Sequence, residues 1–463
     1  MDLHVDFDSI TGILRSASEE GRDFLFEYEV YNVLSRSGAE TPPRSIFIPR
    51  GARPSEDEMM ALPGEKVVIK IVSPAIIHKT EVGGVRIVPK HPDRIRSALR
   101  RMMYEVPENY AQWIDRNPGA APAQYEGLSG QALATAIRRD LLGVLLVQFM
   151  PPDSEAFGNE LIVGLRNTRE FGMIINAGLG GTDTELYARR FRKGQANVVS
   201  ACELIDGESF FELFRRTISY RKLAGLTRGQ RRIVTDEQLV ECFSSFIEMG
   251  RFYSQSNPQA PFVIQELEIN PYAFTDFLMV PLDGMCRFSL PEGRKSRRPT
   301  AKVENLLHPN TMALIGVSTQ RRNFGRIILD NVISQGFPPQ DLFVIREGIS
   351  EIEGVKCVAE LQDLPVKPDL FVVAVGADQV PDLVDEVLRL DAAQSVMLIP
   401  GGMGETEESK SRAEEISSAI DAAHGTEDGG PVFLGANCMG VVSRPGRYDT
   451  WFIPEEKLPR DRE

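Results

Sequence analysis

The chain has 463 residues, more than one ordinary hydrophobic core accommodates, so two or three domains are expected. Its 52 basic and 66 acidic side chains give a net charge of −14, which argues against a general nucleic-acid-binding protein. The five cysteines are odd in number and widely spaced, which disfavours a disulfide framework or a structural zinc site. Because no signal-peptide pattern or membrane-length apolar run is visible, we expect a cytoplasmic protein.

The first 288 residues show an irregular succession of helical and strand patterns. Apolar residues at helical spacing predict a helix over 22–40 and another over 92–104. Residues 105–135 are rich in proline, glycine, alanine and asparagine, which predicts an excursion or insertion. Short apolar runs closed by turn signals predict strands at 66–74, 85–89, 143–150, 160–166, 171–179, 262–274 and 277–284, and helices are expected between 207 and 253.

The segment SLPEGRKSRRPTAK is basic, flanked by prolines and without apolar periodicity, so we expect a linker at residues 289–304. A solvated hinge is favoured over an arm that contacts phosphate, because runs of charge are usually solvated. From 305 to 463 strands and helices alternate, which predicts parallel strand pairing with right-handed crossovers. We therefore expect an α/β protein whose last domain is a doubly wound sheet of the Rossmann type.

One predicted strand of the first domain carries oxygen ligands on a single face. In ELEINP, Glu266, Glu268 and Asn270 alternate along the strand and so point to the same side. Two carboxylates and an amide oxygen are hard ligands that suit Mg²⁺, although a solvent-exposed acidic face gives the same pattern. Asp283 ends the next strand and could add a ligand. Lys70 lies near the end of an apolar strand, so its charge must reach an anion or water.

The segment VVIKIVSPAIIHKTEVGGVRI resembles the ATP-grasp subunit of ADP-forming acetyl-CoA synthetases, which are acyl-CoA synthetases of the nucleoside-diphosphate-forming type. It is similar, more distantly, to the β subunit of succinyl-CoA synthetase. VLLVQFM, NELIVGLR, GLGG and ELEINP follow in the order of that family. The resemblance implies an ATP-grasp domain of two lobes with mixed sheets over residues 1–288. The residues that carry it are Lys70, Ser73, His78, Lys79, Gly83, Gly84 and Val85.

The same resemblance implies roles for individual residues. Lys70 is expected to hold phosphate oxygens of ATP, and Gln148 and Glu160 are expected to contact the nucleotide. A magnesium ion between the nucleotide phosphates would neutralise charge during phosphoryl transfer. The expected ligands of that ion are Glu268, Asn270 and Asp283.

His78 matches the histidine that the family is thought to use as a phosphate carrier beside the ATP site. A neutral imidazole is a competent nucleophile for phosphoryl transfer near pH 7. The alternative is a loop histidine that makes structural hydrogen bonds. Within this motif we favour the phosphate carrier, which makes His78 the candidate catalytic residue.

Residues 308 to about 459 resemble the CoA-binding domain of the same synthetases. IGVS corresponds to a GAS-like turn, IPGGMGE to an SAGF-E loop, and LGANCMG to LGPNC-G. The resemblance implies that Gly316, Ser318, Asn437 and Cys438 line a CoA cleft at the carboxyl ends of the strands. A small packed thiol is a better interpretation of Cys438 than a nucleophile.

Two departures from the family pattern bear on CoA affinity more than on the fold. The family usually has VNP or VNPK after its second strand, where a lysine can meet the CoA phosphate, and this chain has VIREG. Arg346 could replace that lysine. The proline of the GPNC motif is Ala436 in this sequence.

Complete members of the family also contain a flavodoxin-like domain with a mobile phosphohistidine, which no segment of this sequence resembles. We therefore expect an ADP-forming acyl-CoA synthetase, or a subunit of one, that turns a carboxylic acid, CoA and ATP into acyl-CoA, ADP and phosphate. A second polypeptide would supply the missing domain, or the chain is a truncated form with partial activity. The alternatives are a non-catalytic ATP- and CoA-binding regulatory module and an ATP-grasp ligase that forms an amide or peptide bond.

Overall fold

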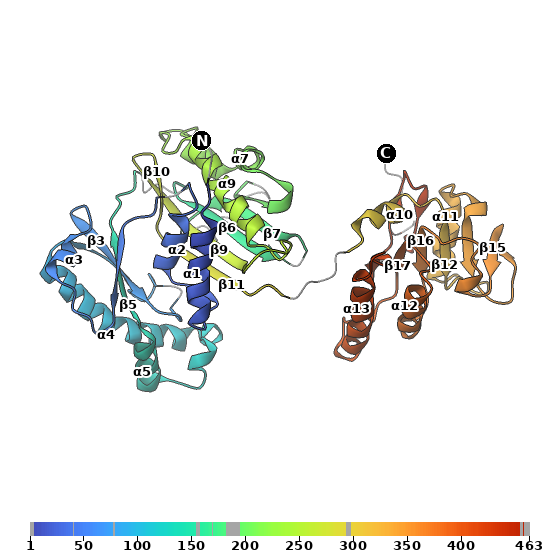
Figure 1. Cartoon of the computed structure of the whole chain (residues 1–463), viewed down its shortest axis with the longest axis horizontal. Helices are drawn as coiled ribbons and strands as arrows, with labels where there is room; N and C mark the ends of the chain where they lie inside the picture. The colour runs from blue at the N-terminus through green and yellow to red at the C-terminus, as the bar shows by residue number, and fades with distance from the viewer. Residues whose placement is uncertain are drawn as a thin grey trace. The chain divides into compact units, whose positions relative to one another are not determined.

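The computed structural model describes residues 4–39, 41–76, 79–153, 158–168, 170–181, 195–292, 298–453 and 457. The chain forms two compact units, residues 1–292 and 293–463, which are described one at a time (Figure 1). The predicted linker, 289–304, spans the division between them. Within it, Thr300–Lys302 forms a 3₁₀ turn that leads into helix α10 (Val303–Leu307).

Two antiparallel sheets form the framework of the first unit. The smaller has the strand order β2-β5-β3-β4, and the larger has the order β1-β11-β9-β6-β7-β8, with β10 paired to β9. The resemblance led us to expect mixed sheets in this unit. The strand pairs that the structure describes there are instead all antiparallel. A short hairpin such as the one that joins β9 to β10 permits only antiparallel pairing. The strands are β1 (Phe24–Leu25), β2 (Ser45–Pro49), β3 (Lys66–Val72), β4 (Val85–Pro89), β5 (Gly143–Gln148), β6 (Leu161–Thr168), β7 (Gly172–Leu179), β8 (Asn197–Ala201), β9 (Val263–Thr275), β10 (Leu278–Pro281) and β11 (Gly284–Ser289).

Helices α4 (Pro92–Arg116) and α5 (Gly130–Asp140) cover one face of the smaller sheet, and their apolar residues form one buried cluster with its strands (Figure 1). The prediction of an excursion over 105–135 is therefore wrong where α4 continues and where α5 begins. Apolar residues of α4 recur at helical spacing as far as Ile114. Their burial outweighs an unfavourable composition that includes Pro107 inside the helix.

A second cluster joins the larger sheet to its helices and to the other face of the smaller sheet. The predicted helix over 22–40 is in fact β1 followed by the shorter helix α2, and the N-terminal helix α1 was not predicted. Helix α2 begins at Glu27 because Phe26 is extended and Glu29 accepts a hydrogen bond from its backbone N–H at 2.7 Å. The other α-helices among the described residues of this unit are α1 (Phe7–Glu19), α2 (Glu27–Leu34), α3 (Glu56–Met60), α7 (Gly207–Phe214), α8 (Ile218–Leu223) and α9 (Asp236–Phe252).

The second unit is built on a sheet of order β14-β15-β13-β12-β16-β17-β18. All its pairs are parallel except β14 with β15. Counted along the chain without the β14 edge, the parallel strands lie in the order 3-2-1-4-5-6, which confirms the predicted Rossmann-type sheet. Its strands are β12 (Met312–Ile315), β13 (Leu342–Ile345), β14 (Glu351–Ile352), β15 (Val355–Val358), β16 (Leu370–Val373), β17 (Ser395–Leu398) and β18 (Val432–Gly435), and β19 (Val442–Ser443) pairs separately with β20 (Tyr448–Asp449).

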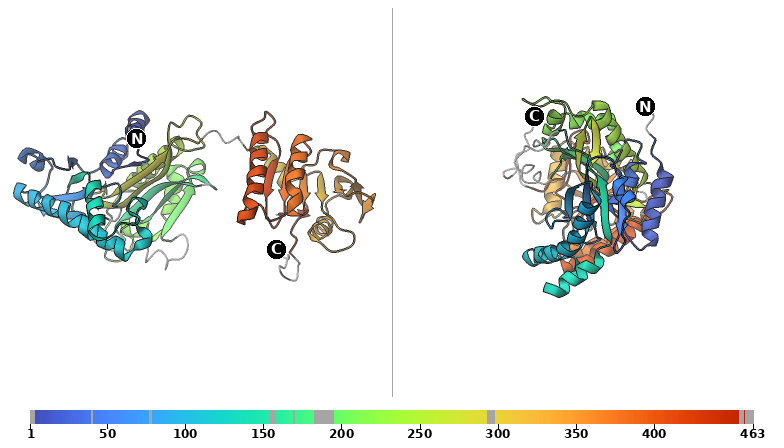
Figure 2. Two further views of the ribbon diagram at one scale, coloured as in Figure 1. Left: turned by 90° about the horizontal axis from the view of Figure 1, so that it is seen from below. Right: turned by 90° about the vertical axis from the view of Figure 1, so that its left-hand side faces the viewer.

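Helices cover both faces of this sheet. Helices α12 (Val380–Arg389) and α13 (Lys410–His424) lie side by side and pack in one buried cluster (Figure 2). Helices α10 and α11 (Phe324–Ser334) pack in a separate cluster on the other face. Because side chains alternate along each strand, the two clusters share the same strands and use opposite faces. The carboxyl ends of β12, β16, β17 and β18 therefore meet at one edge.

Across the part of the chain that the structure describes, no helix combines the length and the apolar character needed to cross a membrane.

Candidate functional site

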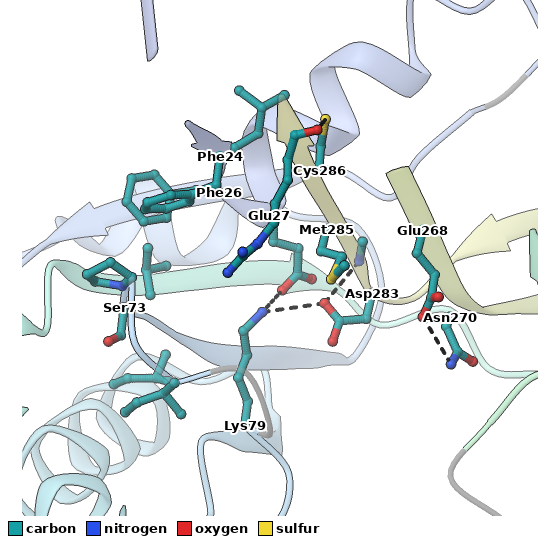
Figure 3. A pocket seen from close by; sticks show the side chains of 17 residues that line it. Phe24, Phe26, Glu27, Ser73, Lys79, Glu268, Asn270, Asp283, Met285 and Cys286 are labelled. Carbon is teal, nitrogen blue, oxygen red and sulfur yellow. Dashed lines mark hydrogen bonds and ion pairs between the residues drawn. The ribbon is translucent and has the colours of Figure 1, made fainter. Parts of the chain in front are cut away.

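A pocket of about 360 Å³ lies in the first unit, between the smaller sheet and the larger sheet (Figure 3). The end of β3 and the loop after it line one side, and the start of α2 together with β9 and β11 lines the other. The lining combines apolar side chains, among them Phe24 and Phe26, with charged ones. Its charged and amide side chains are Glu27, Lys79, Glu268, Asn270, Asp283 and Arg287.

The buried carboxylate of Glu27 binds the two lysines of the predicted ATP-grasp motif. Its Oε1 accepts a hydrogen bond from Lys70 Nζ at 2.6 Å and its Oε2 accepts one from Lys79 Nζ at 2.6 Å. The Tyr31 hydroxyl also donates to Oε1, at 2.6 Å. Lys79 reaches further to Asp283 Oδ1 at 3.4 Å, so this lysine lies between two carboxylates (Figure 3).

The charges in this cluster set the protonation of its members. Burial alone would raise the pKa of Glu27, but the adjacent charges of Lys70 and Lys79 hold it well below its usual range. Burial opposes the charged form of Lys79, yet Glu27 and Asp283 raise its pKa above the ordinary value. The pKa of Asp283 is raised by burial and by the negative charge of Glu27. The Asp283 side chain is 44% exposed, whereas that of Glu27 is 4% exposed.

Glycines shape the loop that carries Lys79. The backbone N–H of Gly84 donates to the Lys79 carbonyl at 2.7 Å, and a Cβ on Gly84 would lie 2.8 Å from the same oxygen. Gly83 has a φ of +73°, in the left-handed region. The glycine pair therefore lets the loop turn back so that Lys79 faces the pocket. His78 lies outside the described residues.

The three residues predicted as magnesium ligands all line the pocket. Glu268 and Asn270 share one face of β9, with Asn270 Nδ2 at 3.5 Å from Glu268 Oε1, and Asp283 stands at the start of β11 (Figure 3). The Asn270 Oδ1 also accepts the N–H of Gly181 at 2.9 Å. Among the described residues, no three His, Cys, Asp or Glu side chains gather as a metal site, so an ion here would need the amide of Asn270 as well. This set of hard oxygen donors fits Mg²⁺.

Lys70 reaches an anion, as expected for a lysine in an apolar strand, and that anion belongs to the protein. Lys70 is buried and does not line the pocket, and its ammonium donates to Glu27 and to the carbonyl of Leu282. The Tyr31 hydroxyl lies 3.5 Å away. The anion that receives its charge is therefore a protein carboxylate that the sequence-based interpretation did not consider.

The two other predicted nucleotide contacts are not among the residues that line the pocket. Gln148 ends β5, and its Oε1 accepts the backbone N–H of Arg44 at 3.3 Å. Glu160 immediately precedes β6, its carbonyl accepts the N–H of Gly180 at 2.9 Å, and burial raises the pKa of its carboxyl. The roles predicted for both residues stay predictions.

In the second unit, the predicted glycine turn lies where the strand order reverses, between β12 and β16. Gly316 has a φ of +94°, and a Cβ there would lie 2.3 Å from the carbonyl oxygen of Ala374 at the end of β16. A Cβ on Gly325, in the first turn of α11, would lie 2.5 Å from the Gly316 carbonyl oxygen. The two glycines thus allow the turn, the neighbouring strand and the helix to approach closely.

Side chains hold this turn in place. Asn323 caps α11 by accepting the N–H of Arg326 at 3.0 Å, and it also accepts the N–H of Ser318 at 3.2 Å. The Ser318 hydroxyl accepts the N–H of Arg321 at 3.2 Å. Arg346 donates to the carbonyl of Val317 at 2.5 Å. Its guanidinium therefore stabilises the turn itself, whether or not it also contacts a ligand.

Asn437 and Cys438 follow β18 at the same edge of the sheet. Asn437 adopts a φ of +53°, and its N–H donates to the Pro400 carbonyl at 2.8 Å. Backbone N–H groups of the 402–405 loop lower the pKa of Glu405, and the Asn437 side chain adds to this effect. The thiol of Cys438 donates to the Leu398 carbonyl at 3.3 Å, and burial raises its pKa, as expected of a packed thiol.

The sequence-based prediction missed the residue that connects the charged cluster, Glu27. The only signal for it was an acidic residue within an otherwise apolar helical run, EYEVYNVL, where a buried carboxylate must find a cation. Arg287, which lines the pocket, and Tyr31 were also missed, because nothing in their local sequence marks them.

Comparison with known families agrees with this architecture. Residues 16–115 and 116–287 match the family described as ATP-grasp domain, and residues 310–444 match the family described as CoA binding domain. The chain belongs to the ATP-grasp family and carries a CoA-binding domain after it.

Several of its relatives are named as ADP-forming acetate–CoA ligases, which confirms the predicted resemblance. The chain is 24% identical over 433 residues to acetate–CoA ligase [ADP-forming] II of Archaeoglobus fulgidus, with 92% of this chain and 53% of the relative covered. It is 29% identical to the β subunit of the Pyrococcus furiosus enzyme I, covering 57% of this chain and 91% of that subunit. It is also 29% identical to the α subunit of that enzyme, covering 34% and 33%. The chain spans about half the length of the Archaeoglobus relative.

Proposed function

We propose that this chain is an ADP-forming acyl-CoA synthetase or a subunit of one. The reaction converts a carboxylic acid, CoA and ATP to acyl-CoA, ADP and phosphate through a phosphohistidine. The observation that carries the proposal is the pocket between the two sheets of the ATP-grasp unit. It combines the cationic side chains of Lys79 and Arg287 with the oxygen donors of β9 and β11, in a chain that also carries a Rossmann-type CoA-binding unit.

The pocket residues divide the binding of a metal–nucleotide complex between them. Mg²⁺, when bound by Glu268, Asn270 and Asp283, would neutralise charge on the nucleotide phosphates. Lys79 and Arg287 supply positive charge on the same lining, and Phe24 and Phe26 supply apolar surface for a base. Lys70, Gln148 and Glu160 remain proposed nucleotide contacts outside the pocket lining.

The second unit supplies the proposed CoA site at the edge where β12, β16, β17 and β18 end. Gly316 and Ser318 form the turn before α11, whose N-terminus favours an anion. Asn437 and Cys438 lie beyond β18 at the same edge. We assign the phosphates of CoA to this edge, with Cys438 as a packing residue.

A partner is part of the proposal. The α and β subunits of the Pyrococcus furiosus enzyme are separate proteins, and each resembles a part of this chain. We propose that a second polypeptide carries the flavodoxin-like phosphohistidine domain and passes phosphate from the nucleotide site to the carboxylic acid.

The test is ADP formation by the full chain with ATP, acetate and CoA, measured with and without an added flavodoxin-like domain of a relative. We expect turnover that requires both acetate and CoA and that depends on the added domain. Robust turnover by the chain alone would overturn the need for a partner. ATP and CoA binding without turnover in either mixture would favour a regulatory module.

His78 has its own test. We expect acid-labile labelling of the protein by γ-labelled ATP in the turnover mixture, and loss of that label in His78→Ala. His91→Ala is a matched control, because His91 precedes α4 and lies outside the pocket lining. A label that survives in His78→Ala would exclude His78 as the phosphate carrier.

A further inference from the structure

Lys79 lies between two carboxylates that hold it unequally. Its Nζ is 2.6 Å from Glu27 Oε2 and 3.4 Å from Asp283 Oδ1 (Figure 3). The Glu27 side chain is 4% exposed, whereas that of Asp283 is 44% exposed. The short contact is to a carboxylate in the protein interior, and the long contact is to one that is half-exposed.

The two contacts differ in strength for that reason. A charge pair interacts more strongly at short distance and in a medium of low dielectric constant. Water screens the longer contact to the half-exposed Asp283, and such pairs contribute little. Lys79 is therefore held mainly by Glu27, and its contact with Asp283 is secondary.

Other residues of the cluster orient the Glu27 carboxylate so that one of its oxygens faces Lys79. Lys70 and Tyr31 both bind Oε1, at 2.6 Å each, which leaves Oε2 directed at Lys79. The Lys70 ammonium also donates to the Leu282 carbonyl, next to Asp283 in the chain. The buried lysine thus anchors the carboxylate, and the carboxylate anchors the lysine of the pocket.

This arrangement matters for Asp283 because an ammonium group and a divalent cation compete for the same carboxylate oxygens. Without Glu27, Asp283 would be the remaining carboxylate beside Lys79, and the two would form a closer pair. The oxygen that contacts Lys79 would then be less available to a metal ion.

We propose that Glu27 is a positioning residue of the metal–nucleotide site: by holding Lys79, it keeps the lysine ammonium from closing onto Asp283 and leaves that carboxylate to a divalent cation. The proposal rests on the proposed function, since it concerns the metal of that site. It assigns a role to a residue that belongs to neither the predicted metal set nor the predicted nucleotide set.

The test follows Mn²⁺, a paramagnetic substitute for Mg²⁺, by electron paramagnetic resonance as it is titrated into the full chain without nucleotide, so that neither chelation by free ADP nor a contact of Lys79 with phosphate enters the measurement. We expect Glu27→Gln to weaken Mn²⁺ binding about tenfold, because Lys79 then pairs with Asp283. The double variant Glu27→Gln/Lys79→Gln should recover Mn²⁺ affinity to within about twofold of Lys79→Gln alone, because the competing ammonium is gone. A purely structural role of Glu27 would give no such recovery.

Lys66→Gln is the matched control, since Lys66 is an exposed lysine at the start of β3 and should leave Mn²⁺ affinity unchanged. Glu27→Gln with wild-type affinity, or a double variant no better than Glu27→Gln, would overturn the inference. If Glu27→Gln fails to fold, Lys79→Gln decides: binding as tight as the wild type or tighter supports the inference, and weaker binding contradicts it. A wild-type chain that binds no Mn²⁺ would instead refute the metal site of the proposed function, and this inference with it.

Discussion

The pocket of the first unit and the strand edge of the second unit are built in opposite ways. The pocket depends on charged side chains that come from distant parts of the sequence, with Glu27 holding Lys70 and Lys79. The strand edge depends on backbone shape, with Gly316 in the left-handed region and packed against the next strand. The first site should therefore be sensitive to loss of charge, and the second to the addition of a single carbon atom.

The largest effect is expected from Glu27→Ala. The substitution leaves two lysine ammonium groups without their buried carboxylate, which typically costs about 3–5 kcal/mol of unfolding free energy. Hydrogen exchange followed by mass spectrometry on each unit would measure it. We expect faster exchange across α2 and β3 and unchanged exchange across β12 to β18; a uniform or absent change would contradict the comparison.

A somewhat smaller loss, about 2–3 kcal/mol, is expected from Gly316→Ala. The new Cβ would lie 2.3 Å from the Ala374 carbonyl oxygen, so β16 or the turn must shift. Calorimetric unfolding should show a lower transition temperature for the second unit and an unchanged one for the first unit. Gly336→Ala is the control, because it also has a positive φ, +83°, but has open space around its Cβ position.

A smaller, pH-dependent effect is expected for Glu27→Gln. The pKa of Glu27 is lowered in the folded protein, so its charged form stabilises the fold above the unfolded pKa of about 4.3. This contribution is lost as the pH falls from there toward the folded-state pKa. The difference in unfolding free energy between wild type and Glu27→Gln should be constant near neutral pH and should shrink below about pH 4. A difference that is independent of pH would exclude this carboxylate as the source.

The smallest effect is expected from Arg346→Lys. Arg346 donates to Val317 and to Thr319, and a lysine can make one of these hydrogen bonds but not both. The lost hydrogen bond should lower the unfolding free energy by about 1 kcal/mol. CoA affinity should fall only slightly, because the guanidinium fastens the turn. A loss of CoA binding by more than about tenfold would show instead that Arg346 contacts the ligand directly.

The sequence predicted the second unit better than the first. Its parallel strands and helices repeat in a regular order, and local apolar runs such as LFVI and LFVV mark buried strands. The strands β2, β8 and β11 of the first unit were missed, because they are half-buried or lie at sheet edges. The C-terminal half of α4 was missed because it contains a proline and many polar residues, which disfavour a helix. Its apolar face is stabilised only by packing against the rest of the unit.

The part of the candidate site that comes from alternate residues of one strand could be predicted. The contacts between charged residues that are distant in the sequence could not. Glu268 and Asn270 could be placed together because the period of a strand puts them on one face. Glu27 and Lys70 could not be paired, because their contact depends on how α2 packs against β3. The buried pair also explains why Lys70 does not extend into the pocket.

The most direct test of the whole account is calorimetric titration of the full chain with Mg-ADP and, separately, with CoA. We predict one site for each ligand, with Asp283→Asn weakening Mg-ADP and sparing CoA, and Gly316→Ala doing the reverse. A chain that binds neither ligand, or in which Asp283→Asn leaves Mg-ADP affinity unchanged, would contradict the assignment of the pocket between the two sheets as a metal–nucleotide site.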